Sequence, residues 1–138
     1  MSSRKTTRIG IAVVEFQRQF LVGIRDTDSP LAGYHEFPGG KCQTDEPTNS
    51  CAVRECLEET GLEVIALKEL IYQEHSYAHA DVKLHFWLCQ PVQVQEDLIN
   101  QNLKGFHWLP LESLPDLQFP EANRNLIELL LSTYQSNC

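Results

Sequence analysis

The most informative segment of the chain runs from Gly39 to Leu62 and reads GGKCQTDEPTNSCAVRECLEETGL. Residues 48–60 within it carry apolar side chains at helical spacing, with Pro47 just before them and Gly61 just after them. Thr and Asn supply cap chemistry at the start of a helix, and glycine is a common residue just beyond its end. The sequence therefore predicts a helix over residues 48–60, preceded by a Pro-Gly-Gly turn at residues 38–40.

Three carboxylates on this predicted helix need an explanation. Glu55, Glu58 and Glu59 stand at i, i+3 and i+4, a spacing that places their Cβ atoms about 5–6 Å apart on one face, where like charges destabilise a bare helix. Three explanations are open. The carboxylates are a solvated acidic face, or they form ion pairs with Arg54 and other cations, or they bind Mg²⁺, which prefers oxygen ligands. Backbone exposed in the Gly-Gly turn can also approach a phosphate closely, and Lys41 can pair with it.

Together with its flanks, the segment resembles the Nudix box. That pattern is Gly, five residues, Glu, seven residues, Arg-Glu, an aliphatic residue, any residue, Glu-Glu, any residue, Gly and an aliphatic residue. Eight of its nine defined positions match here, and the departure is Cys56, a small buried hydrophobe where the family prefers a larger aliphatic residue. The nine positions are Gly40, Glu46, Arg54, Glu55, Cys56, Glu58, Glu59, Gly61 and Leu62.

The resemblance extends in order along nearly the whole chain. Residues 35–41 (HEFPGGK), 85–88 (HFWL) and 119–123 (FPEAN) are similar to segments of MutT-type nucleoside triphosphate pyrophosphohydrolases. The resemblance implies an α+β fold, the Nudix fold, in which a mixed β-sheet lies between helices as an α/β/α sandwich.

The resemblance also implies roles for individual residues. Mg²⁺, or Mn²⁺ with the same oxygen ligands, would be bound by the Gly39 carbonyl and by Glu55, Glu58 and Glu59. Arg54 would orient these glutamates, which makes it the fourth member of the catalytic set. The substrate would be bound by Lys41, Asn123, Arg25 and Phe37, and the loop–helix geometry would depend on Gly40, Glu46 and Gly61.

Several of these roles have plainer alternatives. Asn123 suits a purine edge because an amide both donates and accepts, but Asn also caps helices. The alternative role of Phe37 is packing in the hydrophobic core, and that of Arg25 is a solvated side chain on a loop.

The general base stays open between two places. Glu55 is the candidate within the box, and we favour it. MutT-like enzymes also use a Glu on the loop before the last strands, but that place falls near Gln101 or Asn102, neither of which can be a base. Glu96 and Asp97 lie in the same loop and are the alternative.

Other segments predict the remaining elements. Residues 9–16 and 20–24 indicate a strand hairpin, residues 62–72 an interrupted strand, and residues 81–88, by their alternation, a strand with one buried face. We also expect an extended piece at 34–37, loops at 25–33 and 92–104, a short strand at 106–109 and a closing helix at 121–134. This order favours an α+β fold over repeated βαβ units.

Bulk properties narrow the class of protein. The 138 residues suit one domain spanning 1–138, and the net charge of −8 argues against a partner made of polymeric nucleic acid. No apolar run is long enough to predict a membrane span. Five Cys without a CxxC pair, and no signal peptide, predict reduced thiols in the cytoplasm. The oligomeric state stays open.

We therefore expect a Mg²⁺-dependent hydrolase that cuts a phosphoanhydride bond of a small nucleotide. The favoured reaction converts a nucleoside triphosphate, with an oxidised purine such as 8-oxo-dGTP preferred, into a nucleoside monophosphate and pyrophosphate, a reaction of nucleotide pool sanitation. The alternatives are a Nudix hydrolase of a dinucleoside polyphosphate, ADP-ribose or a nucleotide sugar, and an inactive nucleotide-binding Nudix domain.

Overall fold

The computed structural model describes residues 5–28 and 31–135. Within them, seven strands form one mixed sheet around β1 (Lys5–Phe16), which pairs in parallel with β6 (Ala80–Pro91). The antiparallel partners of β1 are β2 (Gln19–Ile24) and β4 (Gly39–Lys41). The sheet is completed by β3 (His35–Glu36) and β7 (His107–Pro110) beside β2, and by β5 (Val64–Ser76) beside β6.

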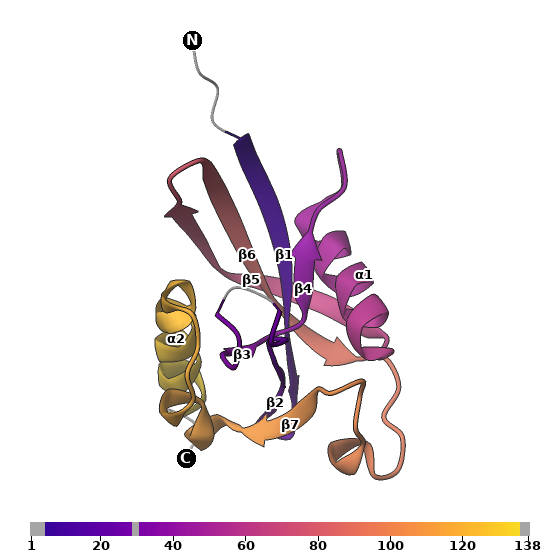
Figure 1. Cartoon of the computed structure of the whole chain (residues 1–138). Coiled ribbons are helices and arrows are strands. Elements are labelled where there is room, and N and C mark those ends of the chain that lie inside the picture. Colours follow the sequence, from indigo (N-terminus) through magenta and orange to yellow (C-terminus); the bar gives the residue numbers. More distant parts are fainter. Residues whose placement is uncertain (1–4, 29–30, 136–138) are drawn as a thin grey trace.

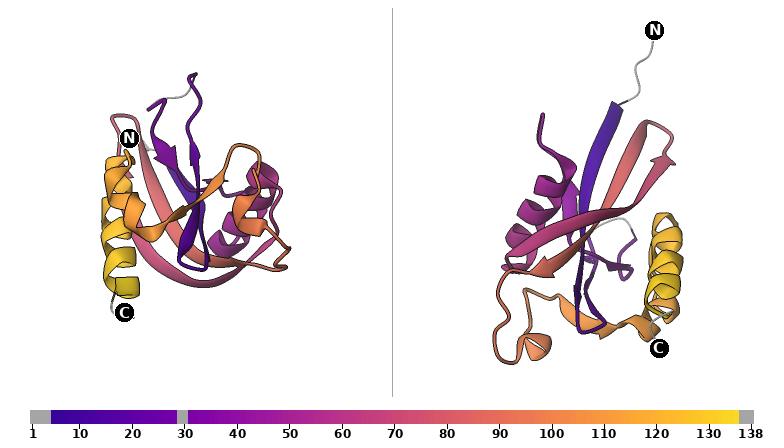
Figure 2. Two further views of the ribbon diagram at one scale, coloured as in Figure 1. Left: turned by 90° about the horizontal axis from the view of Figure 1, so that it is seen from below. Right: turned by 180° about the vertical axis from the view of Figure 1, so that it is seen from behind.

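The two long helices cover opposite faces of this sheet. Helix α1 (Thr48–Thr60) lies on one side and α2 (Arg124–Gln135) on the other, as the views in Figures 1 and 2 show. The predicted α/β/α sandwich is therefore confirmed. None of the helices in the described part of the chain has the length and apolar character needed to cross a membrane.

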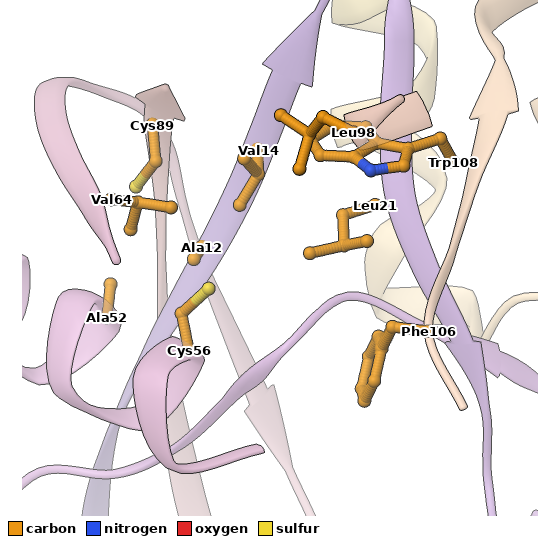
Figure 3. Close-up of a cluster of buried hydrophobic side chains, with 10 residues drawn as sticks. All are labelled: Ala12, Val14, Leu21, Ala52, Cys56, Val64, Cys89, Leu98, Phe106 and Trp108. Carbon is orange, nitrogen blue, oxygen red and sulfur yellow. The ribbon is translucent and has the colours of Figure 1, made fainter. Parts of the chain in front are cut away.

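Each face of the sheet has its own hydrophobic core. On the α1 side, Ala12 and Val14 of β1 meet Ala52 and Cys56 of α1 (Figure 3). On the α2 side, the intervening Val13 joins a second cluster that includes Phe20, Phe86, Leu126 and Leu130. Strand β1 is thus buried on both faces, which explains why its sequence is an almost continuous apolar run.

Helix α1 has the predicted bounds. The carbonyl of Pro47 accepts the N–H of Cys51, and Gly61 ends the helix in the left-handed region with φ 78°. The predicted apolar stripe of Ala52, Val53, Cys56, Leu57 and Thr60 is partly wrong, because Leu57 is 47% exposed whereas Cys51, outside that stripe, is fully buried. The helix instead turns its small side chains toward the sheet, which allows close packing.

The turn predicted at residues 38–40 is also wrong in part. Gly39 and Gly40 belong to β4 and pair with Ile11 and Gly10 of β1. Glycine is usually a poor strand residue, but here it leaves room for the side chains that α1 packs against β4. The extended piece predicted at 34–37 is a strand only at His35–Glu36.

Other boundaries differ from the predictions by a few residues. The β1–β2 hairpin turns on Gln17 and Arg18 alone, both with positive φ. Strand β5 starts and ends later than predicted and carries two register irregularities against β6. Short 3₁₀ helices occur at Leu98–Asn100, in the predicted 92–104 loop, and at Leu111–Asp116. The predicted closing helix begins as a 3₁₀ turn, Glu121–Asn123, before α2 starts at Arg124.

Strand β6 is covered on both faces rather than one. Leu84 and Phe86 pack into the α2-side core, whereas Trp87 and Cys89 pack on the α1 side. The indole N–H of Trp87 donates to the Thr48 hydroxyl at 3.0 Å, which allows this polar group to lie under the start of α1. The alternation of β6 therefore separates two cores, not core from solvent.

The cysteines of the described chain are free thiols, namely Cys42, Cys51, Cys56 and Cys89. Cys138 lies outside the described residues.

Candidate active site

Two of the predicted carboxylates are held against β4. The backbone N–H of Gly39 donates to Oε1 of Glu59 at 3.1 Å. The Glu55 carboxylate lies directly over Gly40, where a methyl group would overlap with it. Positions i and i+4 of α1 thus both face β4, and Glu58 at i+3 extends toward solvent, with 58% of its side chain exposed.

The environment of Glu59 is unfavourable for a negative charge. The pKa of Glu59 is raised to about 7, chiefly by burial; the negative charges of Glu36, Glu55 and Glu58 contribute to this rise, and the hydrogen bond from Gly39 opposes it. A divalent cation would reverse this balance by favouring the ionised carboxylates. The oxygen donors present here are of the kind that Mg²⁺ prefers, although no three carboxylates of the described residues gather closely enough in this structure to form a metal-holding group by themselves.

Arg54 connects the glutamates of the box. Its Nε donates to Oε2 of Glu46 at 2.8 Å and its Nη2 donates to Oε1 of the same carboxylate at 3.0 Å. Its Nη1 reaches Glu55 at 3.1 Å and Glu58 at 3.2 Å. One planar guanidinium therefore holds the loop and two helix positions in a single geometry.

Glu46 is the fixed end of this network. Besides Arg54, it accepts the N–H of Gln43 at 2.9 Å through Oε1. The hydrogen bonds from Arg54, followed by that from Gln43, lower the pKa of Glu46 to about 2. The hydrogen bonds described for this carboxylate all come from the loop after β4 or from α1. This is the geometry expected of a structural residue.

A pocket of about 700 Å³ opens beside Gly39 and Gly40. Its floor is apolar and comes from the sheet, through Ile9, Ile11, Val82 and Leu84. Its walls include every residue predicted to bind substrate: Arg25, Phe37, Lys41 and Asn123. Residues far apart in the sequence thus converge on one cavity beside β4, whose lining contains Gly39 and Gly40 but none of the glutamates of α1. Another hollow, of about 660 Å³ between residues 114 and 131, contains no residue of the box.

The alternatives for two pocket residues can be compared with the structure. Phe37 is 6% exposed and stacks on Phe119 with 5.1 Å between ring centroids, so it belongs to the core and forms a pocket wall at once. Asn123 ends the 3₁₀ turn before α2, where its backbone N–H bonds to the Pro120 carbonyl. Its side chain forms no hydrogen bond to another residue of the described chain, so no capping bond occupies the amide.

The alternative general bases lie elsewhere. Glu96 and Asp97 are exposed and do not line the pocket. Asn102, near the place of the MutT-type loop glutamate, uses its Oδ1 to accept the Gly105 N–H at 2.8 Å. Glu55 does not line the pocket either, but among these candidate bases it is the one that lies against Gly40, a lining residue.

Nine lining residues of the pocket were not predicted from the sequence; besides the apolar floor, they include Leu31, Glu36 and Tyr77. Leu31 and Tyr77 lie on loops at the rim, and Glu36 lies on β3. The Glu36 carboxylate is 3.8 Å from Nη1 of Arg25, and burial raises its pKa although Arg25 opposes that rise. Its only signal in the sequence is its place in the extended piece before Gly39.

Comparison with known proteins identifies the family and the fold of this chain. The family model described as the NUDIX domain matches residues 10–129. The chain is 33% identical to the 8-oxo-dGTP diphosphatase of Buchnera aphidicola subsp. Acyrthosiphon pisum (strain APS), over 69% of this chain and 75% of the relative. It is 30% identical to the CTP pyrophosphohydrolase of Escherichia coli (strain K12), over 60% of this chain and 62% of the relative. The solution structure of the E. coli ORF135 protein shares the fold, with a TM-score of 0.76 at 23% identity, covering 96% of this chain and 94% of that one.

Proposed function

Because this chain belongs to the Nudix family, we propose that it hydrolyses a nucleoside triphosphate to a nucleoside monophosphate and pyrophosphate in a Mg²⁺-dependent reaction. The observation that carries this proposal is the pocket that unites Arg25, Phe37, Lys41 and Asn123 beside Gly39 and Gly40. An oxidised purine such as that of 8-oxo-dGTP is the favoured base, supported by the name of the relative from Buchnera.

Each residue has a physical role in this proposal. Glu55, Glu58 and Glu59, with the Gly39 carbonyl, would hold Mg²⁺, and Mn²⁺ fits the same ligands. When bound, the metal neutralises phosphate charge and stabilises the leaving oxygen. Arg54 orients Glu55 and Glu58 through its hydrogen bonds.

The pocket residues would divide the substrate between them. Lys41, next to Gly40 at the end of β4, and Arg25 are the cations that would pair with phosphate oxygens. The Asn123 amide would donate to and accept from the base edge. The apolar floor and Phe37 would contact the flat faces of the base and the sugar.

We propose Glu55 as the general base that accepts a proton from the attacking water. It lies against Gly40 and is oriented by Arg54, and general-base catalysis contributes typically about 10²–10⁴-fold. A Glu55→Gln variant should lose activity on that scale, whereas Glu96→Gln should not. Near-normal turnover of Glu55→Gln with an inactive Glu96→Gln would overturn this assignment.

The family relation leaves other substrates to be tested. The CTP pyrophosphohydrolase relative makes a pyrimidine triphosphate a specific second candidate. A dinucleoside polyphosphate, ADP-ribose or a nucleotide sugar would also present the diphosphate that the site requires. An inactive nucleotide-binding domain is the remaining alternative, although such domains usually lose box carboxylates and this chain keeps them.

The deciding experiment is product analysis on a nucleotide panel. We would include 8-oxo-dGTP, dGTP, CTP, a dinucleoside polyphosphate and ADP-ribose, each with Mg²⁺, with chelator, and with a Glu59→Gln variant. The proposal expects pyrophosphate from 8-oxo-dGTP, lost with chelator and reduced at least roughly 10²-fold in Glu59→Gln. Preference for CTP would change the base, and activity only on ADP-ribose or the polyphosphate would change the substrate class. Mg²⁺ binding without turnover would contradict the enzymatic proposal.

We also propose that one domain spans residues 1–138 and that the protein acts in the cytoplasm on free nucleotides, without a polymeric nucleic acid or membrane partner. The free thiols Cys42, Cys51, Cys56 and Cys89 support a reducing compartment.

A further inference from the structure

The packing of β4 against α1 brings two cysteines together beside the candidate active site. Glu55 lies over Gly40 on the face of β4 that meets α1. Cys42 is two residues beyond Gly40, on the same side of the extended chain, and Cys51 is one helical turn before Glu55. The rise from Gly40 to Cys42 is about 6.8 Å along a strand, and the rise from Glu55 back to Cys51 is about 6 Å along a helix. Because the two rises are similar, Cys42 comes to lie opposite Cys51.

The contacts agree with this register. The Cys42 N–H still bonds to the Arg8 carbonyl at 2.9 Å, so the backbone remains alongside β1. The Cys42 thiol is also among the groups that raise the pKa of the Cys51 thiol, as expected of neighbouring side chains. Cys51 is fully buried and its Sγ donates to the Gly40 carbonyl at 3.4 Å, whereas Cys42 is partly exposed.

We propose that Cys42 and Cys51 are a redox-active pair, which hydrogen peroxide oxidises to an intramolecular disulfide while the protein stays folded. The Cys42 thiolate attacks one peroxide oxygen, the O–O bond breaks, and the departing hydroxide takes up a proton to give water and a sulfenic acid at Cys42. The Cys51 sulfur then attacks the sulfenic sulfur. The S–S bond forms, the S–O bond breaks, and the Cys51 proton leaves with the hydroxide as a second water.

Exposure decides the order of these two steps. Cys42 can meet a peroxide from solvent, whereas burial of Cys51, together with its contact to Cys42, raises the pKa of the Cys51 thiol to about 12. Cys51 is therefore a poor thiol for a dissolved oxidant, but its position opposite Cys42 makes it the resolving partner. Disulfide formation removes the Sγ–H donor from the Gly40 carbonyl and closes the short loop that contains Glu46.

The same protein supplies an internal control. Cys56 and Cys89 are also neighbours in the α1-side core, where burial raises their pKa values to about 11 and about 12. Both are fully buried, so neither is accessible to a peroxide in the folded state. They should stay reduced while Cys42 and Cys51 are oxidised.

The test needs no nucleotide, so its outcome is independent of the proposed function. The full chain with Cys138→Ser, which removes the terminal thiol, would be treated with hydrogen peroxide, alkylated and mapped by mass spectrometry without reduction. We expect a cross-link between residues 42 and 51 that lacks two hydrogens, alkylated Cys56 and Cys89, and full reversal by dithiothreitol. The oxidised form should melt roughly 5 °C higher, and neither change should appear in Cys42→Ser or Cys51→Ser.

Two outcomes would overturn the proposal. One is Cys42 oxidised to sulfinic or sulfonic acid while Cys51 remains alkylatable. The other is a disulfide that links two copies of the chain or involves Cys56 or Cys89. Cys42→Ser keeps the test valid if Cys51→Ser fails to fold, because Cys42 is partly exposed.

Discussion

The glycines of β4 determine how closely the carboxylates of α1 approach the strand. Glu59 accepts a hydrogen bond from Gly39, and Glu55 occupies the space that a side chain at Gly40 would need. Glu58, one residue before Glu59, has no such contact with β4 and remains exposed. The three glutamates are therefore not equivalent, although their spacing places all three on one helix face.

Replacing Gly40 tests this close contact. In Gly40→Ala the new methyl group overlaps with the Glu55 carboxylate, the end of a flexible side chain that can move aside, so we expect a loss of about 1 kcal/mol in the free energy of unfolding, the low end of the usual cost of overpacking. Urea denaturation measures the loss. The same substitution in a Glu55→Ala background should cost much less, because the overlapping atoms are gone. An equal cost in both backgrounds would show that strain in β4, not Glu55, is the cause.

Sequence reasoning succeeds at this scale where the residues share one helix. The spacing of Glu55 and Glu59 predicts neighbours on α1, and they are neighbours. Glu36 and Tyr77 were missed because they reach the pocket from β3 and from the loop after β5. Only the pairing of the strands brings them to Gly39, and no local pattern encodes that pairing.

At the scale of elements, one ion-pair network joins the loop after β4 to α1. Arg54 of the helix holds Glu46 of the loop in two hydrogen bonds and also donates to the Lys41 carbonyl at 3.2 Å. Helix α1 has no side-chain cap bond at its first residue. The network therefore helps to fix the start of α1 relative to β4.

The low pKa of Glu46 predicts how this network depends on pH. Its pKa falls from 4.5 to about 2 on folding, so the stabilisation is present above about pH 4.5 and is lost as pH falls toward 2. The melting temperature of the wild type should therefore exceed that of Glu46→Gln by a constant margin from pH 5 to 8, and this margin should shrink below pH 4.5. Salt should also reduce it, since the pair is partly solvated. Thermal unfolding of both proteins checks this.

A control removes the general effect of acid. Glu96→Gln deletes an exposed carboxylate outside this network, so its margin to wild type should be small and independent of pH. A margin for Glu46→Gln that persists unchanged at pH 3 would contradict the role of the ionised Glu46.

Elements differed in how well the sequence predicted them. Helix α1 was predicted to the residue because periodicity, Pro47 and Gly61 all mark it. Strand β4 was missed because its Gly-Gly pair has the composition of a turn, and its strand character comes from pairing with Ile11 and Gly10. The second buried face of β6 was missed because Trp87 is covered by α1, a contact between distant segments.

At the scale of the whole molecule, the site lies where α1 meets the edge of β4, between the two cores. The α/β/α sandwich follows from the Nudix resemblance, whereas composition and element order alone reach only the α+β class. The box carboxylates place several negative charges around a half-buried Glu59. This arrangement disfavours the metal-free folded state relative to one in which a cation neutralises them.

Mg²⁺ should therefore stabilise the folded protein. At a concentration about 100 times its dissociation constant, a ligand that binds only the folded state contributes about 2.7 kcal/mol, which corresponds to a rise in Tm of roughly 5–10 °C. Differential scanning fluorimetry against Mg²⁺ concentration measures this rise without substrate. It should largely disappear in Glu59→Gln but persist in Glu128→Gln, whose exposed carboxylate lies on α2 across the sheet. An equal rise in all three proteins would mean that Mg²⁺ acts on the acidic surface in general, and that Glu59 does not bind it.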